Sequence, residues 1–401
     1  MRLPVVSPYV RPFRRDGALW FDNPASDLRE ALPEVERDTL AALWDPAAAA
    51  AALDAALARH GADAIARAIA DLAARGYLVG DRAEADHALI AALERRRPAV
   101  PFVDQIELTN RCPMRCGFCP RGVPGGVTRP TGFMEPALFE LILDQLHPDQ
   151  AAYRPLELHH LGESLLHPEL PALVAAAAAR GLPTELSVNP SLLTPALGAA
   201  LLDAGLSRLV VSLDGVDDAT LIAIRGPAAR YDRAERNLDA LLDHVAGMAR
   251  PPRAVIQMID LARNRHQRDA FLARWGGLGL ATVTAFVKDL DGADPDTGAA
   301  SARPLVHLCG YPWRSVVILW DGRVVPCCRD ADAALVLGDL RTQSLATIWD
   351  GPEAQRLRDQ HRRDDVPAGH LCDGCAWRRT RFADAMPSRH PDRAVEWPLA
   401  W

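Results

Sequence analysis

Three cysteines lie close together in the run T-N-R-C-P-M-R-C-G-F-C-P, at Cys112, Cys116 and Cys119. Their C-x3-C-x2-C spacing puts three thiolates on one short loop, where they can bind three irons of a cubane cluster. A four-iron cluster held by protein alone takes four cysteines. Three cysteines leave one iron with open coordination positions, so such a cluster can bind a reactant as well as transfer electrons.

The elements that must position this loop alternate between strands and helices from about residue 101. Short apolar strands are expected at 102–108, 156–160, 184–188, 207–213, 253–258 and 280–286. Helical patterns lie between them at about 135–146, 169–180, 194–204, 231–246 and 266–275. Six such repeats predict an α/β fold, with a parallel sheet curved into a partial (β/α)6, TIM-like barrel. Barrel active sites lie at the C-terminal strand ends, and the cysteine loop follows the first strand.

The cysteine triad, with aromatic Phe118 before its last member, resembles the signature of the radical S-adenosylmethionine (SAM) superfamily. In that family SAM binds the open iron, and an electron from the reduced cluster cleaves SAM to a 5′-deoxyadenosyl radical. The alternatives are a plain electron-transfer cluster and a structural zinc site. Zinc takes four ligands, and no fourth cysteine lies nearby. The resemblance implies a radical SAM enzyme whose cofactors include SAM and a [4Fe–4S] cluster.

Several residues further along the chain match SAM contacts of this family. Leu161-Gly162-Glu163 resembles the Gly-Gly-Glu motif, with leucine at the first glycine, so Gly162 and Glu163 are expected to hold the methionine amino group. The other implied contacts are Ser187 and Asn189 at the ribose, Ser212 at the mouth of the site, Arg225 at the methionine carboxylate and Phe118 near the adenine. Each of these residues alone could also be an ordinary turn, cap or packing residue.

Four later cysteines surround an expected β-hairpin at 315–328, whose Asp-Gly dipeptide favours a tight turn. They are Cys309, Cys327, Cys372 and Cys375. Their spacing resembles the twitch form of the family's SPASM extension, and a helix is expected at about 344–361. The resemblance implies one auxiliary [4Fe–4S] cluster that carries electrons. Zinc is again the alternative, because a Cys-x2-Cys pair alone would permit it.

Cys328 is left over from both ligand sets. It follows Cys327 directly, so on a regular strand it points to the opposite face. We consider it a candidate hydrogen-atom donor, because epimerases of this kind need one. A spare thiol and an alternative cluster ligand are the other interpretations.

Residues 1–95 are expected to form a separate module with a winged-helix-like fold. A strand at 17–22, helices at about 36–44, 47–60 and 62–75, and a strand at 76–79 carry this prediction. Such modules resemble domains that bind leader peptides, with the peptide paired to an edge strand, here 18–22. A packing module without a ligand is the alternative. The tract Glu94–Pro98 is interpreted as a linker. The predicted domains are 1–95, the barrel at 100–300, the iron–sulfur domain at 301–385 and a tail at 386–401.

The amino-acid composition of the chain argues against two classes of binding partner, nucleic acids and membranes. The 401 residues carry a net charge of −7 and no basic block, which argues against nucleic acid. No signal-peptide core or run of about 20 apolar residues is found, so no membrane association is expected. The eight cysteines are clustered, which favours metal binding over disulfides in a cytoplasmic protein.

Two substrate classes remain for the expected reaction, in which a flavodoxin- or ferredoxin-type reductant supplies one electron. The N-terminal module favours a precursor peptide that is cross-linked or epimerised during natural-product biosynthesis. The single auxiliary cluster, similar to that of an aminocyclitol dehydrogenase, favours a small polar molecule such as an amino sugar or aminocyclitol. We favour the peptide. A non-catalytic electron-transfer protein is a third hypothesis, but the SAM contacts would then have no purpose.

Overall fold

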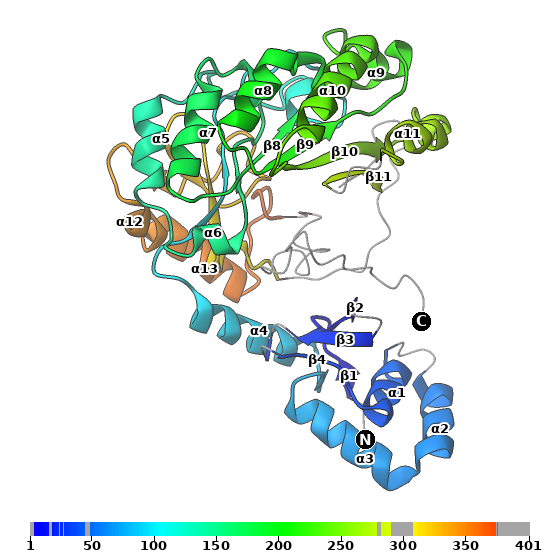
Figure 1. The fold of residues 1–401 in the computed structure, drawn as a ribbon. Coiled ribbons are helices and arrows are strands. Elements are labelled where there is room, and N and C mark those ends of the chain that lie inside the picture. Colours follow the sequence, from blue (N-terminus) through cyan, green and yellow to red (C-terminus); the bar gives the residue numbers. More distant parts are fainter. Residues whose placement is uncertain are drawn as a thin grey trace. The chain divides into compact units, whose positions relative to one another are not determined.

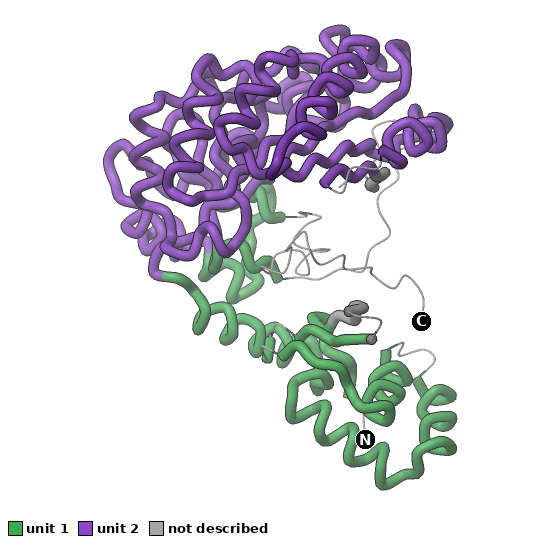
Figure 2. Tube along the Cα trace, in the orientation of Figure 1, with its two compact units in different colours: residues 1–98, 304–314, 358–401 green, residues 99–303, 315–357 purple. Residues whose placement is uncertain are grey.

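The computed structural model describes residues 4–15, 18–23, 25–26, 28–44, 49–278, 282–289, 308–373 and 375. The chain divides into two compact units (Figure 2). The smaller unit contains residues 1–98, 304–314 and 358–401, and the larger unit contains residues 99–303 and 315–357. The region after residue 301 therefore contributes to both units. The domain boundaries expected from the sequence stay predictions.

The larger unit is built on a nine-stranded sheet (Figure 1). Its strands are β6 (Phe102–Ile106), β7 (Leu156–Glu157), β8 (Thr184–Val188), β9 (Arg208–Ser212), β10 (Arg253–Asp260), β11 (Val283–Asp289), β12 (Ser315–Ile318), β13 (Arg323–Val325) and β14 (Gly338–Asp339). They are hydrogen-bonded in the order β11-β10-β9-β8-β7-β6-β12-β13-β14. Strands β6 to β11 run parallel, in the sequential order that the βα repeats predict. The fold class, an α/β partial barrel, is confirmed.

Helices connect the parallel strands and cover one face of the sheet (Figure 1). They are α5 (Pro136–Leu143), α6 (Gln150–Tyr153), α7 (Leu170–Ala179), α8 (Pro195–Asp203), α9 (Asp218–Arg225), α10 (Tyr231–Ala246) and α11 (Arg268–Trp275), with α12 (Leu345–Trp349) after the last strand. Short 3-10 helices lie at Pro120–Gly122, Ser164–Leu166, Pro190–Leu192 and Arg265–Gln267.

The two faces of the sheet differ in polarity. In β8, Leu186 and Val188 are fully buried, whereas Glu185 and Ser187 alternate with them. Because successive strand residues point to opposite faces, the apolar set lies on one face and the polar set on the other. The apolar face is the one that can pack under helices. In β8 this second face carries Glu185 and Ser187, whereas the neighbouring strands β9 and β10 place Val210 and Val255 beside Ser187 on the same face.

The predicted hairpin exists, and it also extends the barrel sheet. Gly322, with φ +93°, closes the turn between β12 and β13, as the Asp-Gly dipeptide indicates. Strand β12 pairs in parallel with β6, with Ser315 opposite Phe102. The sequence does not predict this pairing, because it joins segments more than 200 residues apart and leaves no local pattern.

The smaller unit contains two small sheets and a group of helices. Its elements are β1 (Val5–Val6), β2 (Arg11–Arg15), β3 (Ala18–Asn23), β4 (Leu28–Glu30), α1 (Glu34–Ala42), α2 (Ala49–His60), α3 (Ala62–Ala74), β5 (Leu78–Val79) and α4 (Arg82–Arg96), followed by the 3-10 helix Tyr311–Trp313 and the last turn of α13 (Pro352–Arg362). Strands β2, β3 and β4 form an antiparallel sheet, and β1 pairs with β5. Phe21, Leu40, Leu72 and Tyr77 form the centre of its core. The likeness to a winged helix stays a prediction.

Two sequence expectations for this unit are wrong. The strand at 18–22 is not an edge, because β3 pairs with β2 on one side and with β4 on the other. The tract Glu94–Pro98 is not wholly a linker, because α4 continues to Arg96. Strands β2 and β4, which flank β3, and the last turn of α4 are short or charged, so their apolar patterns are too weak to recognise in the sequence.

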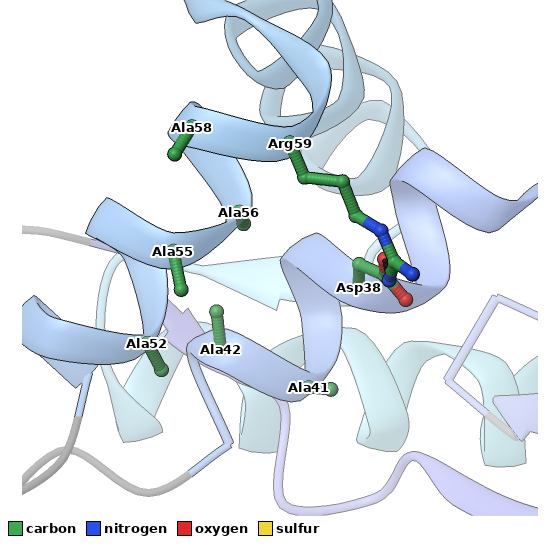
Figure 3. Close-up of a pocket in the computed structure, with 8 residues that line it drawn as sticks. All are labelled: Asp38, Ala41, Ala42, Ala52, Ala55, Ala56, Ala58 and Arg59. Carbon is green, nitrogen blue, oxygen red and sulfur yellow. Dashed lines mark hydrogen bonds and ion pairs between the residues drawn. The ribbon is translucent and has the colours of Figure 1, made fainter.

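A hollow of about 710 Å3 lies between α1 and α2 (Figure 3). Its lining is six alanines, with the Asp38–Arg59 ion pair beside them at 2.9 Å. None of the predicted site residues lies there, and alanine offers no group for chemistry.

No helix within the described ranges is long and apolar enough to cross a membrane.

Candidate active site

The cysteine loop leaves the C-terminal end of β6 and is held by backbone hydrogen bonds. The N–H of Arg115 donates to the carbonyl of Arg225 at 2.8 Å, and the N–H of Cys119 donates to the carbonyl of Cys116 at 3.0 Å. Gly122 packs against the loop so closely that a Cβ there would lie 2.1 Å from the Cys116 carbonyl oxygen. Only glycine fits this position, so the loop has a fixed shape around its thiols.

The chemistry of the three thiols fits an iron–sulfur cluster. Burial, with smaller contributions from the nearby Glu163, Cys116 and Cys119, raises the pKa of Cys112 to about 12. Burial also raises the pKa of Cys116. Such thiols become thiolates only when a metal offsets the cost. No three His, Cys, Asp or Glu side chains of the described residues are placed to hold a single ion. In a cubane cluster each thiolate binds a different iron, so the three thiols do not have to surround one shared ion.

Arg225 lies against the cysteine loop and is paired with a buried acid. Its Nε donates to Asp214 at 2.8 Å, and its Nη1 lies 4.0 Å from the Cys116 Sγ. Burial opposes its charge, but Asp214 outweighs this and raises the pKa of Arg225 above its usual value. Asp214 is fully buried and also accepts the N–H of Ile259 at 2.9 Å. The guanidinium lies over the Phe118 ring, 5.7 Å from its centroid. The arrangement keeps one positive charge beside a predicted cluster ligand.

This pair predicts opposite shifts in the reduction potential of the SAM-binding cluster. Arg225→Gln removes a positive charge near Cys116, so the potential should become more negative. Asp214→Asn leaves the arginine charge unbalanced, so the potential should become more positive. We expect shifts of about 30–60 mV, since 59 mV corresponds to tenfold in a one-electron couple. EPR-monitored titration without SAM measures both, and shifts of the same sign would contradict the arrangement.

Glu163 is buried at the end of the segment that follows β7. Its carboxylate accepts the N–H groups of Asn189 at 2.8 Å and of Leu165 at 3.2 Å. A Cβ on the preceding Gly162 would lie 2.0 Å from the Thr109 carbonyl oxygen, so this segment crosses the start of the cysteine loop in direct contact. The amide nitrogen of Asn189 is buried without a partner among the described residues. A buried carboxylate and an unsatisfied amide donor fit a polar cofactor such as SAM.

Burial raises the pKa of Glu163 to about 7, which predicts pH-dependent binding of SAM. An amino group of SAM is bound better by the carboxylate than by the neutral acid. Between pH 6 and pH 8 the carboxylate fraction rises from about 0.1 to about 0.9. The affinity for SAM should therefore rise about tenfold over this range. Equilibrium dialysis with the reconstituted protein measures it. Glu163→Gln should remove the pH dependence, and the same slope in this variant would contradict the role of Glu163.

Ser187 and Ser212 lie on the same face of the sheet, because Ser187 pairs with Val210, two residues before Ser212 in β9. The N–H of Ser187 donates to His159 Nδ1 at 3.2 Å, and the Ser212 hydroxyl accepts from the Gln257 side chain at 3.1 Å. His160 also bonds to Gln105 at 2.9 Å. The sequence analysis does not include these two histidines and two glutamines. Gln105 and Gln257 lie within strands, where their face is known only once the strand register is known, whereas His159 and His160 follow β7 and lie in no strand.

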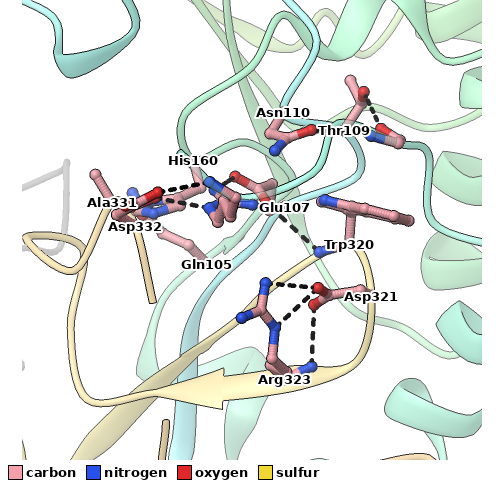
Figure 4. A network of polar contacts seen from close by, with 12 residues as sticks. Gln105, Glu107, Thr109, Asn110, His160, Trp320, Asp321, Arg323, Ala331 and Asp332 are labelled. Carbon is pink, nitrogen blue, oxygen red and sulfur yellow. Dashed lines mark hydrogen bonds and ion pairs between the residues drawn. The ribbon is translucent and has the colours of Figure 1, made fainter. Parts of the chain in front are cut away.

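A buried ion pair ties the segment after the cysteine loop to the hairpin region (Figure 4). Arg129 Nη1 donates to Glu107 at 2.7 Å, and both side chains are almost completely buried. Arg129 Nε donates to the Ala331 carbonyl at 2.7 Å, while Asp332 accepts the backbone N–H groups of Thr128 and Arg129. The residues that follow Cys119 and those that follow Cys328 are therefore held together within the larger unit.

The C-terminal cysteines belong to both units. Cys327 and Cys328 lie in the larger unit, whereas Cys309, Cys372 and Cys375 lie in the smaller one. Cys372 and Cys375 form a turn, in which the N–H of Cys375 donates to the Cys372 carbonyl at 3.5 Å. Their role as ligands of one auxiliary cluster stays a prediction.

Cys328 packs against Val317, Leu319 and Val325 in a small apolar cluster. Burial raises the pKa of its thiol to about 11. The thiol therefore keeps its hydrogen at neutral pH, as a hydrogen-atom donor must. Its predicted role is compatible with this environment.

Comparisons with known proteins agree with these features. The family model of the radical SAM superfamily matches residues 106–250, and that of the SPASM iron–sulfur cluster-binding domain matches residues 309–376. The chain is 26% identical over 290 residues to the PqqA peptide cyclase of Granulibacter bethesdensis, covering 63% of this chain and 75% of that protein. It is 22% identical over 279 residues to the S-adenosyl-L-methionine-dependent 2-deoxy-scyllo-inosamine dehydrogenase of Niallia circulans, covering 68% and 91%.

Among solved structures, SuiB of Streptococcus suis bound to S-adenosylmethionine superposes with a TM-score of 0.46 at 14% identity. The superposition covers 88% of this chain and 90% of SuiB.

The barrel, the buried polar groups of Glu163 and Asn189, and the cysteine loop fit an enzyme that binds SAM at an iron–sulfur cluster. The chain belongs to the radical SAM superfamily and carries a C-terminal SPASM domain. Its cofactors are SAM and iron–sulfur clusters in both regions.

Proposed function

We propose that this enzyme modifies a ribosomally made precursor peptide, by cross-linking or epimerisation. The observation that carries the proposal is the similarity to PqqA peptide cyclases, which covers about three quarters of their length. Residues 1–98, which belong to the smaller unit and lie outside both matched family regions, support it as the place where a peptide binds.

The chain's own residues have separate tasks in this reaction. When bound, SAM and the reduced cluster supply a 5′-deoxyadenosyl radical that removes a hydrogen atom from an unactivated carbon. Cys112, Cys116 and Cys119 hold the cluster. Glu163 and Asn189 hold SAM through the buried polar groups described above. A flavodoxin- or ferredoxin-type protein is the proposed reductant.

The edge strand β4 is the proposed site where the peptide pairs. An added strand needs backbone N–H and C=O groups along an open edge. The other edge, β2, contains Pro12, which has no N–H to donate. In β4 the side chain of Glu30 is fixed by Arg75 at 2.9 Å and by the Tyr77 hydroxyl at 3.1 Å, so this strand is anchored. The edge that the sequence predicts at 18–22 is thereby replaced by residues 28–30.

Hydrogen–deuterium exchange of the full chain tests this proposal, with a synthetic precursor peptide of the PqqA type, named for its relatives, as probe. We expect the peptide to bind and to slow exchange in residues 28–30, with little change in residues 11–15. A peptide that does not bind, or that protects only residues 11–15, contradicts the proposed pairing.

The two proposed modifications of a peptide, epimerisation and cross-linking, require different roles of Cys328. Epimerisation ends when a new hydrogen atom is delivered to the substrate radical, and the Cys328 thiol is the proposed donor. Cross-linking needs no such donor. Cys328→Ala should stop product formation in the first case and leave it unchanged in the second, while SAM cleavage continues in both. Mass spectrometry of the peptide after incubation in deuterated water distinguishes them.

A second candidate function is the oxidation of a small polar molecule. It is favoured by the similarity to the 2-deoxy-scyllo-inosamine dehydrogenase, of which the chain covers 91%. The polar side chains of Gln105, His160, Ser212 and Gln257 would suit an amino sugar or aminocyclitol. Under this alternative, residues 1–98 would have no role in substrate binding, and deletion of the peptide-binding edge would not change turnover.

A further inference from the structure

Helix α4 is capped at its first turn. The N-cap Asp81 accepts the N–H of Glu84 at 2.9 Å, and Glu84 accepts the N–H of Gly80, the residue before the cap, at 2.7 Å. Its last turn contains Arg95 and Arg96, which suit the negative end of a helix dipole. Glu94 lies in this last turn.

The apolar face of α4 packs against the segment that contains Cys309. Leu89 and Leu93 share one buried cluster with Leu308, which precedes this cysteine, and with Trp313, which follows it by four residues. Trp313 is 1% exposed, and it closes the 3-10 helix Tyr311–Trp313. Cys309 therefore lies in the chain between Leu308 and Trp313, whose side chains both pack in the same cluster as α4.

Glu94 joins this segment to the part of the chain that precedes the Cys372–Cys375 turn. Its Oε1 accepts the indole N–H of Trp313 at 2.6 Å and the Arg362 Nε at 2.8 Å. Arg358 adds a hydrogen bond to the Pro312 carbonyl at 3.2 Å. Burial raises the pKa of Glu94, but the hydrogen bonds from Trp313 and Arg362 outweigh this and hold it below its usual range.

We propose that Glu94 is a positioning residue for the auxiliary cluster, and that through it α4 sets the placement of Cys309. The proposal rests on the predicted ligand role of Cys309 and does not depend on the identity of the substrate. Groups that hold a ligand's segment act on occupancy and potential of the metal centre, although they touch no metal. Without Glu94, a buried indole N–H and an arginine lose their shared acceptor.

Two variants of the full chain and one control, all reconstituted anaerobically, test this role. Glu94→Ala removes the acceptor, whereas Glu94→Gln keeps an oxygen for Trp313 but removes the charge. Arg95→Gln changes an exposed neighbour on the same helix. The readouts are iron per chain, the EPR spectra of both clusters and their reduction potentials.

We expect Glu94→Ala to lose at least half of the auxiliary-cluster EPR signal, while the SAM-binding cluster keeps its spectrum and its change on SAM addition. Glu94→Gln should retain the auxiliary cluster with a shifted potential, and Arg95→Gln should match the unaltered chain. Three results would overturn the proposal: an unchanged auxiliary cluster in Glu94→Ala, equal loss of both clusters in both variants, or an unaltered chain without an auxiliary cluster. Failure of peptide binding would refute only the proposed function, since none of these readouts uses a peptide.

Discussion

Replacing Cys112, Cys116 and Cys119 together by alanine should abolish reductive cleavage of SAM. Without thiolates on this loop the cluster that binds SAM cannot assemble, so 5′-deoxyadenosine formation should fall by on the order of 10^4 or more, below detection. Iron should fall from about eight to about four per chain, because the auxiliary cluster has its own ligands. Mass spectrometry of the nucleoside and iron analysis after reconstitution measure the two effects.

Cys328→Ala is the matched control for this experiment. It removes one thiol that is predicted to bind neither cluster and that packs against Val317, Leu319 and Val325. Its iron content and rate of SAM cleavage should equal those of the unaltered chain. The assignment of the three cysteines would be contradicted if the triple variant still cleaved SAM, or if Cys328→Ala lost as much iron.

Arg129→Met should strongly destabilise the larger unit. It leaves the Glu107 carboxylate buried without its charged partner, and breaking a buried pair in this way costs about 3–5 kcal/mol. It also removes the hydrogen bond to the Ala331 carbonyl. Urea unfolding followed by circular dichroism measures the loss of unfolding free energy.

The double variant Glu107→Leu with Arg129→Met separates the effect of the unpaired charge from that of lost packing. Removing both charges takes away the desolvation penalty, so the double variant should recover more than half of the stability lost in Arg129→Met. A single variant that loses less than about 1 kcal/mol would mean that the pair contributes no more than a surface ion pair.

Much of the barrel can be predicted from sequence because its strands are short apolar runs separated by helices of regular length. Leu186 and Val188, for example, are buried as such a run requires. The pairing of β12 with β6 cannot be predicted in this way, since parallel pairing over 200 residues leaves no local trace. In the smaller unit, β2 carries arginines and a proline, and β4 is only three residues long with Arg29 and Glu30, so neither shows an apolar alternation. The sequence pattern therefore indicates an edge where the sheet has its central strand.

The residues of the candidate site also fall into those that the sequence predicts and those that it does not. The cysteine triad can be predicted because its spacing alone restricts what it can bind. The Asp214–Arg225 pair cannot, because its members lie 11 residues apart on a strand end and a helix end. The contact of Arg225 with Cys116 depends on how α9 packs against the loop. Such tertiary contacts follow from the fold and have no signature of their own in the sequence.

Deuterium transfer from substrate to cofactor tests the central claim most directly. The reconstituted enzyme would be incubated with SAM, a reductant and a deuterated synthetic precursor peptide of the PqqA type, and the mass of the 5′-deoxyadenosine measured by mass spectrometry. Abstraction from the peptide predicts 5′-deoxyadenosine that carries one deuterium, together with a peptide of changed mass or stereochemistry. Unlabelled 5′-deoxyadenosine with the peptide, but labelled product with a deuterated aminocyclitol, would contradict a peptide as the substrate.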